Sequence, residues 1–261
     1  MTQVNILLIT KGHPFDRTAF FEMFDALDVN WTHVEQPAAR VFFDTTLAQD
    51  YDAFVFYDMP GLAFTPSGPD FEKPSEAFKQ GFLDLLDSGK GMLFMHHALA
   101  GWPAWPEYAE IVGGRFLYLP DSLRGKDCQD SGYRHGVTHT VSAVADHPIT
   151  HGLPSSFEMT DELYLAEVFT DSITPLLQSN YAFVEENFYS ATKAVKEGKM
   201  FDNENWHHPD GSNLVGWTKY YGKSPLVYVQ GGDDPVAYQN PNYRQLLENA
   251  IRWVADPANI F

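Results

Sequence analysis

Polar residues that could do chemistry follow several apolar runs of the sequence. The run GMLFM ends in His96 and His97, and a small-residue stretch, ALAG, comes next. One interpretation is structural, with imidazoles that hydrogen-bond to backbone at the end of a strand. The other is chemical, because α/β proteins bind their ligands at the carboxyl ends of parallel strands. The rest of the sequence has to decide between them.

Three other apolar runs end in a similar way. His13 and Arg17 follow the first run, Asp58 follows another, and Asp233 follows the last. A strand-terminal aspartate is usually a helix cap or turn residue, and a histidine beside a proline is usually a loop residue. Because such residues recur after four predicted strands, we favour a shared site. We expect His13, Asp58, His96 and Asp233 to line one pocket.

The elements that would position these residues alternate along the chain. Apolar runs predict strands, and apolar residues at helical spacing predict helices. We expect strands at residues 4–10, 30–35, 53–57, 92–95 and 226–230, and helices at 15–27, 74–88 and 243–254. This order indicates a parallel sheet with helices on both faces. Residues 115–220 are less regular and contain runs that predict additional strands.

Composition restricts the class of protein. The chain has 261 residues, of which 44% are hydrophobic, and its 35 acidic and 17 basic side chains give a formal net charge of −18. This charge disfavours nucleic acid and anionic membranes as partners. We expect one elaborated domain over residues 1–261. We also expect a cytoplasmic protein, since the first apolar run is too short for a signal peptide or a membrane span. The sequence is compatible with a homo-oligomer.

Five segments together resemble one protein family. They are GMLFMHHA at 91–98, GGRF at 113–116, DHPITHGLP at 146–154, DELY at 161–164 and YVQGGDDPVAYQNPNYRQLLENAIRWV at 228–254. In this combination the sequence resembles the ThuA-like (trehalose utilisation) family of the class I glutamine amidotransferase-like superfamily. The resemblance implies a flavodoxin-like, class I glutamine amidotransferase-like three-layer fold with a mainly parallel sheet.

The resemblance also bears on the chemistry at His96. In related amidotransferases a nucleophilic cysteine occupies the turn after the equivalent strand, where this sequence has His96. The one cysteine, Cys128, lies in the polar stretch RGKDCQDSG, so we expect no thiol-dependent glutaminase. The resemblance implies a role in carbohydrate metabolism, as a hydrolase, lyase or isomerase acting on a sugar, keto-sugar or related polyol. The alternative is a non-catalytic sugar-binding or accessory protein that keeps the fold.

A metal site is a further expectation. Imidazoles and carboxylates suit one divalent ion, either zinc, manganese or magnesium, held by His13, His96 and Asp233. Similar proteins often carry a histidine where this chain has Asp233. An oxygen ligand at that position would shift the preference from zinc towards harder ions. If the position instead supplies a general base, its operating pKa changes.

The remaining site residues are assigned in two groups. On the resemblance, we expect Asp161 and Glu162 to be catalytic together with His96 and Asp233. We expect His97 to point elsewhere or to support His96 from behind, since consecutive residues at a strand end face opposite ways. The expected substrate-binding residues are His13, Arg17, Asp58, His97, Trp102, His135 and Tyr164. Trp102 is expected to form a pocket wall, because aromatic faces commonly stack on sugar rings.

Overall fold

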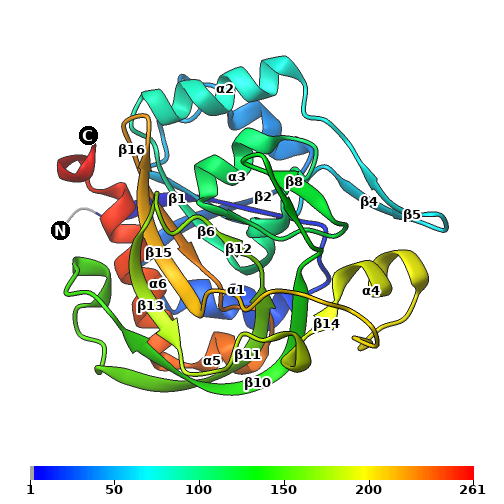
Figure 1. Ribbon diagram of the computed structural model, residues 1–261. Helices are drawn as coiled ribbons and strands as arrows, with labels where there is room; N and C mark the ends of the chain where they lie inside the picture. The colour runs from blue at the N-terminus through cyan, green and yellow to red at the C-terminus, as the bar shows by residue number, and fades with distance from the viewer. Residues whose placement is uncertain (1–2) are drawn as a thin grey trace.

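A ten-stranded sheet runs through the computed structural model, which describes residues 3–261 (Figure 1). Its parallel part has the order β2-β1-β3-β6-β16. These strands are β1 (Val4–Lys11), β2 (Val29–Glu35), β3 (Ala53–Asp58), β6 (Gly91–Met95) and β16 (Ser224–Val229). This is the flavodoxin-like strand order, and it confirms the expected fold class.

The other half of the sheet is antiparallel, so the sheet as a whole is mixed. It is built by the irregular middle of the sequence, where we expected additional strands, and it continues from β16 in the order β15-β13-β10-β11, with β14 paired to β10. These strands are β10 (Gly132–Ala143), β11 (Ser156–Leu165), β13 (Thr174–Ser179), β14 (Tyr189–Ser190) and β15 (Leu214–Tyr221).

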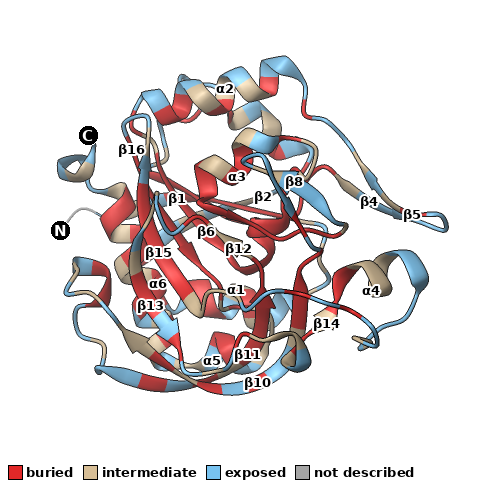
Figure 2. Cartoon of the chain, viewed as in Figure 1, coloured by how far each residue is buried: buried red, intermediate tan, exposed pale blue. Residues whose placement is uncertain are grey.

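Helices cover both faces of the parallel part. They are α1 (Arg17–Asp25), α5 (Pro235–Gln239) and α6 (Pro241–Ala255) on one face, and α2 (Glu76–Asp87) and α3 (Pro106–Val112) on the other. Successive residues of a strand face opposite ways. Thus Ile6 and Leu8 of β1 pack with α1 and α6, whereas Leu7 and Ile9 pack with α2. Figure 2 shows the resulting buried centre.

The expected elements are present with small shifts at their ends. All eight begin and end within two residues of the sequence expectation. The helix termini have ordinary chemical causes: Asp16 Oδ1 accepts a hydrogen bond from the Ala19 N–H at 2.9 Å, and Ser75 Oγ accepts one from the Phe78 N–H at 3.2 Å. Among residues 3–261, no helix is both long and apolar enough to cross a bilayer.

Short elements surround the carboxyl edge of the sheet. The strand pairs are β4 (Leu62–Thr65) with β5 (Gly68–Phe71), β7 (Gly114–Arg115) with β12 (Glu167–Val168), and β8 (Asp121–Leu123) with β9 (Lys126–Cys128). The remaining helix is α4 (Ala191–Glu197). The β4–β5 hairpin and α4 project from the same side of the molecule and contact each other (Figure 1).

Candidate functional site

His96 occupies a strained turn at the end of a buried strand. β6 ends at Met95, and His96 opens the short 3₁₀ helix η2 (His96–Ala100) with φ 46°. A positive φ is uncommon outside glycine, and residues held this way cluster at functional sites. A turn of this kind presents the nucleophile in α/β-hydrolases. Here it presents an imidazole at the carboxyl edge of the sheet.

The two ring nitrogens of His96 have different surroundings. Nδ1 lies 2.7 Å from the backbone oxygen of Gln230, which can only accept, so Nδ1 carries the proton. Nε2 lies 2.8 Å from the Tyr164 hydroxyl, 3.0 Å from Glu162 Oε2 and 3.3 Å from Asp233 Oδ1. A neutral ring would point its Nε2 lone pair at two carboxylates. Nε2 therefore needs either a proton, which would be the second on the ring, or a metal cation.

Two further imidazoles approach the same carboxylates. His135 lies with Nε2 3.4 Å from Glu162 Oε1 and with Nδ1 3.5 Å from Asp233 Oδ2. His13 Nδ1 lies 3.9 Å from Asp233 Oδ1. Three imidazoles thus surround two carboxylates. We call His13, His96, His135, Glu162 and Asp233 the His–carboxylate cluster.

Burial and charge shift the pKa values of this cluster. Burial by itself lowers the pKa of His96, but hydrogen bonds to Asp233 and Glu162 outweigh it and raise this pKa well above its usual value. Burial raises the pKa of Asp233, yet His135 and His96 pull it below its usual value overall. The hydrogen bond to Asp233 raises the pKa of His135. Asp233 thus stays ionised and attracts positive charge to Nε2 of His96.

The donor atoms could hold one divalent cation. Ligand atoms of His96, Glu162 and Asp233 all lie within 4.8 Å of one another. Asp233 Oδ1 and His13 Nδ1 are both buried, and Asp233 Oδ1 lies 3.3 Å from His96 Nε2 and 3.9 Å from His13 Nδ1. Metal-ligating histidines almost always donate their other N–H to a carboxylate, carbonyl or water, as His96 does to Gln230. The mixture of imidazole and carboxylate suits Zn²⁺ or Mn²⁺.

Asp161 shapes the loop that carries Asp233. Its Oδ2 accepts a hydrogen bond from the Gly232 N–H at 2.6 Å, and its Oδ1 accepts one from the Asp233 N–H at 3.0 Å. Gly232 has φ 111°, a conformation that favours glycine. Asp161 is fully buried, and its carboxylate is engaged by this loop. Asp161 therefore positions the loop that carries Asp233, and its expected catalytic role stays a prediction.

Two residues of the cluster, His135 and Glu162, lie on the antiparallel strands β10 and β11. The register of β10 against β11 shifts between Arg134 and Val137, and this irregularity includes His135. Such bulges re-aim side chains. On β11, the Tyr164 N–H donates to the side-chain oxygen of Gln230 at 2.9 Å. Sequence reasoning missed Gln230, although its place as a polar residue closing the run LVYVQ was a usable signal.

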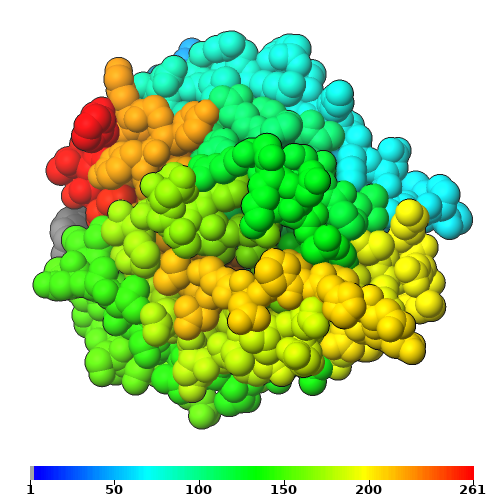
Figure 3. Space-filling model, viewed as in Figure 1, coloured from blue at the N-terminus to red at the C-terminus, as the bar shows by residue number. Residues whose placement is uncertain are grey.

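A cavity of about 520 Å³ adjoins the cluster. Its polar lining consists mainly of His13, His135, Glu162 and Tyr164, whereas His96 is fully buried behind them. The hairpin β4–β5 and α4 contribute to its walls. In the space-filling view, these segments lie next to each other at one side of the molecule (Figure 3). A ligand in the cavity would contact the cluster through His13, His135 and Glu162, with the Tyr164 side chain beside them.

Four expected substrate-binding residues do not line the cavity in the described structure, and Arg17 and Asp58 are the first two. Arg17 is exposed and pairs with Glu35, its Nη1 lying 2.5 Å from Oε1. Asp58 closes β3 as expected, but its Oδ2 accepts a hydrogen bond from Gln36 Nε2 at 3.1 Å. Asp58 is 1% exposed, and this burial raises its pKa to about 7. The expectation that His13, Asp58, His96 and Asp233 line one pocket is therefore wrong for Asp58. Of the other three, His13 lines the cavity, whereas His96 and Asp233 adjoin it within the cluster.

Trp102 and His97 are packing residues in this structure. Trp102 is 1% exposed, and its ring centroid lies 5.0 Å from that of Phe78, so it does not form the expected pocket wall. The His97 ring stacks between His13, at 4.9 Å, and Tyr57, at 4.2 Å. It therefore supports the cluster from behind and does not line the cavity.

The thiol of Cys128 is buried, although its sequence neighbours are polar. It lies at the end of β9, 5% exposed, with Sγ 3.6 Å from the backbone oxygen of Lys126. Burial raises its pKa. A raised pKa lowers the thiolate fraction, which is the reactive form of a cysteine. The environment of Cys128 is therefore unsuited to nucleophilic chemistry.

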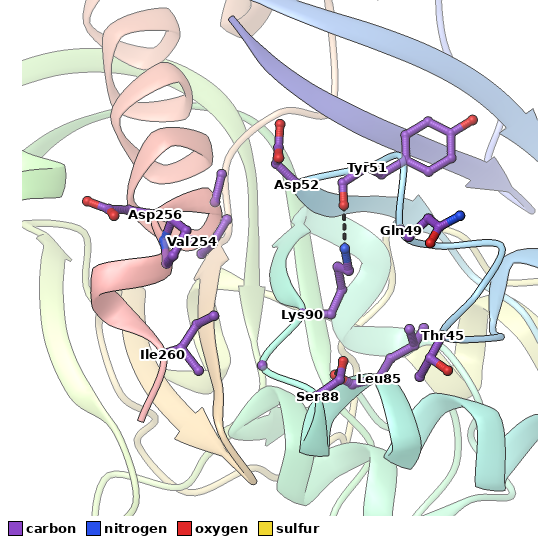
Figure 4. A pocket seen from close by; sticks show the side chains of 13 residues that line it. Thr45, Gln49, Tyr51, Asp52, Leu85, Ser88, Lys90, Val254, Asp256 and Ile260 are labelled. Carbon is purple, nitrogen blue, oxygen red and sulfur yellow. Dashed lines mark hydrogen bonds between the residues drawn. The ribbon is translucent and has the colours of Figure 1, made fainter. Parts of the chain in front are cut away.

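A second cavity, of about 260 Å³, lies at the opposite edge of the parallel strands (Figure 4). Lys90, just before β6, donates to the backbone oxygens of Ala48, at 3.1 Å, and of Tyr51. Asp52, just before β3, accepts a hydrogen bond from the Asn5 N–H at 2.7 Å. Because backbone groups engage both charges, we assign no chemistry to this cavity.

Comparison with known sequences identifies a family. The profile of the ThuA family, described as trehalose utilisation, matches residues 6–254, which is nearly the whole chain. Among curated proteins, none matches the sequence significantly.

Solved structures show the same fold at low sequence identity. A putative ThuA-like protein from Parabacteroides merdae superposes with a TM-score of 0.66 at 18% identity, covering 97% of this chain and 90% of its own. A cytoplasmic protein from Salmonella typhimurium gives a TM-score of 0.59 at 13% identity, with 96% and 99% coverage. A putative GMP synthase component from Thermoplasma acidophilum gives 0.51 at 13% identity, with 97% and 94% coverage. The fold is thus ThuA-like and amidotransferase-like.

Proposed function

This chain belongs to the ThuA family, and we propose that it is an enzyme that acts on a sugar, keto-sugar or related polyol with the help of one divalent cation. The observation that carries the proposal is the orientation of His96. Its Nδ1–H donates a hydrogen bond to the backbone oxygen of Gln230, and its Nε2 faces Glu162 and Asp233. The family's description as trehalose utilisation supports a sugar-like substrate.

The residues divide into those that hold the cation and those that face the substrate. His96, Glu162 and Asp233 would bind the cation, with His13 close enough to complete the set. A divalent cation in this place would polarise a carbonyl or hydroxyl oxygen of the substrate. The net charge of −18 also favours cation binding over anion binding.

Two side chains at the cavity are suited to proton transfer. Tyr164 has its pKa raised well above the usual value by burial, so it keeps its proton and can donate a hydrogen bond. His135 has a raised pKa and a side chain that is 41% exposed, so it can exchange protons with a ligand or with water. With an imidazole at the turn, this favours acid–base chemistry over a covalent intermediate. Hydrolase, lyase and isomerase reactions all fit that requirement.

The proposal is tested by screening sugars and keto-sugars against the chelator-treated protein, with and without added Mn²⁺ or Zn²⁺. A ligand of the folded state raises the melting temperature. We expect sugar-like compounds to stabilise the cation-loaded protein and to be converted by it. Binding without conversion of any compound would favour the non-catalytic alternative. No stabilisation by any sugar or cation would contradict the proposal.

A further inference from the structure

The cavity beside the His–carboxylate cluster is polar only where it meets that cluster. His13, His135, Glu162 and Tyr164 gather there through their mutual contacts with Asp233 and His96. The rest of the lining is mostly apolar. It includes Met59, Phe64, Phe116, Ala194, Val195 and Met200.

Two hydroxyls in this apolar part already have partners. The Tyr118 hydroxyl donates to Met59 Sδ at 2.9 Å. The Tyr133 hydroxyl lies 3.8 Å from Met200 Sδ and accepts a hydrogen bond from the Phe201 N–H at 3.0 Å. Burial raises the pKa of both phenols, so both stay neutral. Neither tyrosine adds a free polar group comparable to those at the cluster.

A free disaccharide would fit this distribution badly. It carries hydroxyls around its whole surface, and a buried hydroxyl without a hydrogen-bond partner is costly. Aromatic faces can stack on a sugar ring, but methionine, valine and alanine side chains give the hydroxyls no strong partner. The volume of about 520 Å³ is ordinary for a cavity that takes a drug-sized ligand.

The apolar part continues to the surface. Phe64 on β4 and Met200 after α4 both line the cavity and are 57% and 53% exposed. Phe64 belongs to the β4–β5 hairpin and Met200 follows α4, and this hairpin and helix contact each other. An apolar group of a ligand could therefore extend from the cluster towards the solvent between these segments.

Resting on the proposed function, we propose that the substrate is a glycoside or sugar conjugate with an apolar aglycone. The sugar contacts the His–carboxylate cluster, and the apolar group occupies the part of the cavity lined by Phe64, Val195 and Met200. Burial of the apolar group supplies affinity that a free disaccharide lacks.

The test compares ligands that differ only in the aglycone. Methyl and phenyl glycosides of glucose and galactose, as both anomers, are titrated calorimetrically into the cation-loaded protein, with trehalose as the free disaccharide. We expect the phenyl glycoside of the preferred sugar to bind at least about ten-fold more tightly than its methyl counterpart. Equal affinities, tighter binding of trehalose, or no binding of any phenyl glycoside at millimolar concentration would overturn the inference.

Variants separate this inference from the proposed function. Val195→Asp should remove the phenyl advantage, whereas Val144→Asp, at an exposed position outside the cavity lining, should keep it. Met200→Glu serves if Val195→Asp does not fold. A phenyl advantage that depends on Val195 but not on His96→Ala would contradict the proposed site alone. Binding that depends on His96, with no effect of Val195→Asp, would contradict the apolar subsite alone.

Discussion

His96 Nδ1 lies 2.7 Å from the backbone oxygen of Gln230, and this contact places a proton on Nδ1. The carbonyl can only accept, so Nδ1 holds a proton and Nε2 is left to face Glu162 and Asp233. The surroundings of Nε2 therefore favour a positive charge there, supplied either by a proton or by a metal ion.

The first prediction compares the two adjacent histidines. His96→Ala should lower turnover by roughly 10²-fold or more, because it removes the group on which the arrangement of the cluster depends. His97→Ala should cost less activity but about 1–3 kcal/mol of stability, because it empties a buried stack between His13 and Tyr57. Turnover per folded molecule and the melting temperature are measured for both variants. A well-folded His96→Ala protein with wild-type turnover would refute the role of His96.

The second prediction concerns the positioning role of Asp161. Asp161→Asn replaces one carboxylate oxygen with an NH₂ group that would face a backbone N–H of Gly232 or Asp233. We expect a loss of about 1–3 kcal/mol in the free energy of unfolding and weaker cation binding. Urea denaturation measures the first effect, and calorimetry measures the second. Glu158→Gln, at an exposed position on the same strand, is the control. Unchanged values in Asp161→Asn would rule out this role.

The third prediction concerns the pH dependence of stability. Burial raises the pKa of Asp58 from 3.8 to about 7 in the folded protein. The protonated form is therefore favoured in the folded state, and the associated stability is present below pH 3.8 and lost as the pH rises through 7. Asp58→Asn should raise the free energy of unfolding by roughly 1–3 kcal/mol at pH 8 and by little at pH 4.

The same variant tests the role of Asp58 in binding. Asp58 bonds Gln36 and does not line the cavity in the described structure, so Asp58→Asn should keep wild-type affinity for the ligand. Stability is measured at both pH values by urea denaturation, and affinity by calorimetry. A variant that is less stable than wild type at pH 8, or that loses ligand affinity, would count against this account of Asp58.

Sequence patterns predicted the parallel part of the fold because its strands are buried on both faces. β3 and β6 are buried along their whole length, and such strands appear in a sequence as continuous apolar runs. The direction of the side chains after a strand was harder to predict. Tyr57 faces the His97 ring, so its neighbour Asp58 points the other way and bonds Gln36. The positive φ of His96 likewise could not be anticipated in a run of non-glycine residues.

The antiparallel residues of the site depended on pairings that no local pattern reveals. Glu162 and Tyr164 reach His96 only through the position of β11, and His135 reaches the carboxylates beside an irregularity in β10. Sequence alone selected these three residues, but through family resemblance or a loose context and not through geometry. The acceptor for His96 Nδ1 is a backbone oxygen, which leaves no signature in residue types.

Calorimetric titration of the chelator-treated protein with Mn²⁺ and Zn²⁺ tests the central claim, that His96, Glu162 and Asp233 hold a divalent cation, most directly. We expect the wild type to bind one of these ions at a single site. Glu162→Gln should weaken binding by at least about ten-fold, whereas Glu158→Gln on the same strand should match the wild type. Failure of the wild type to bind either ion, or equal affinity in wild type and Glu162→Gln, would contradict the claim.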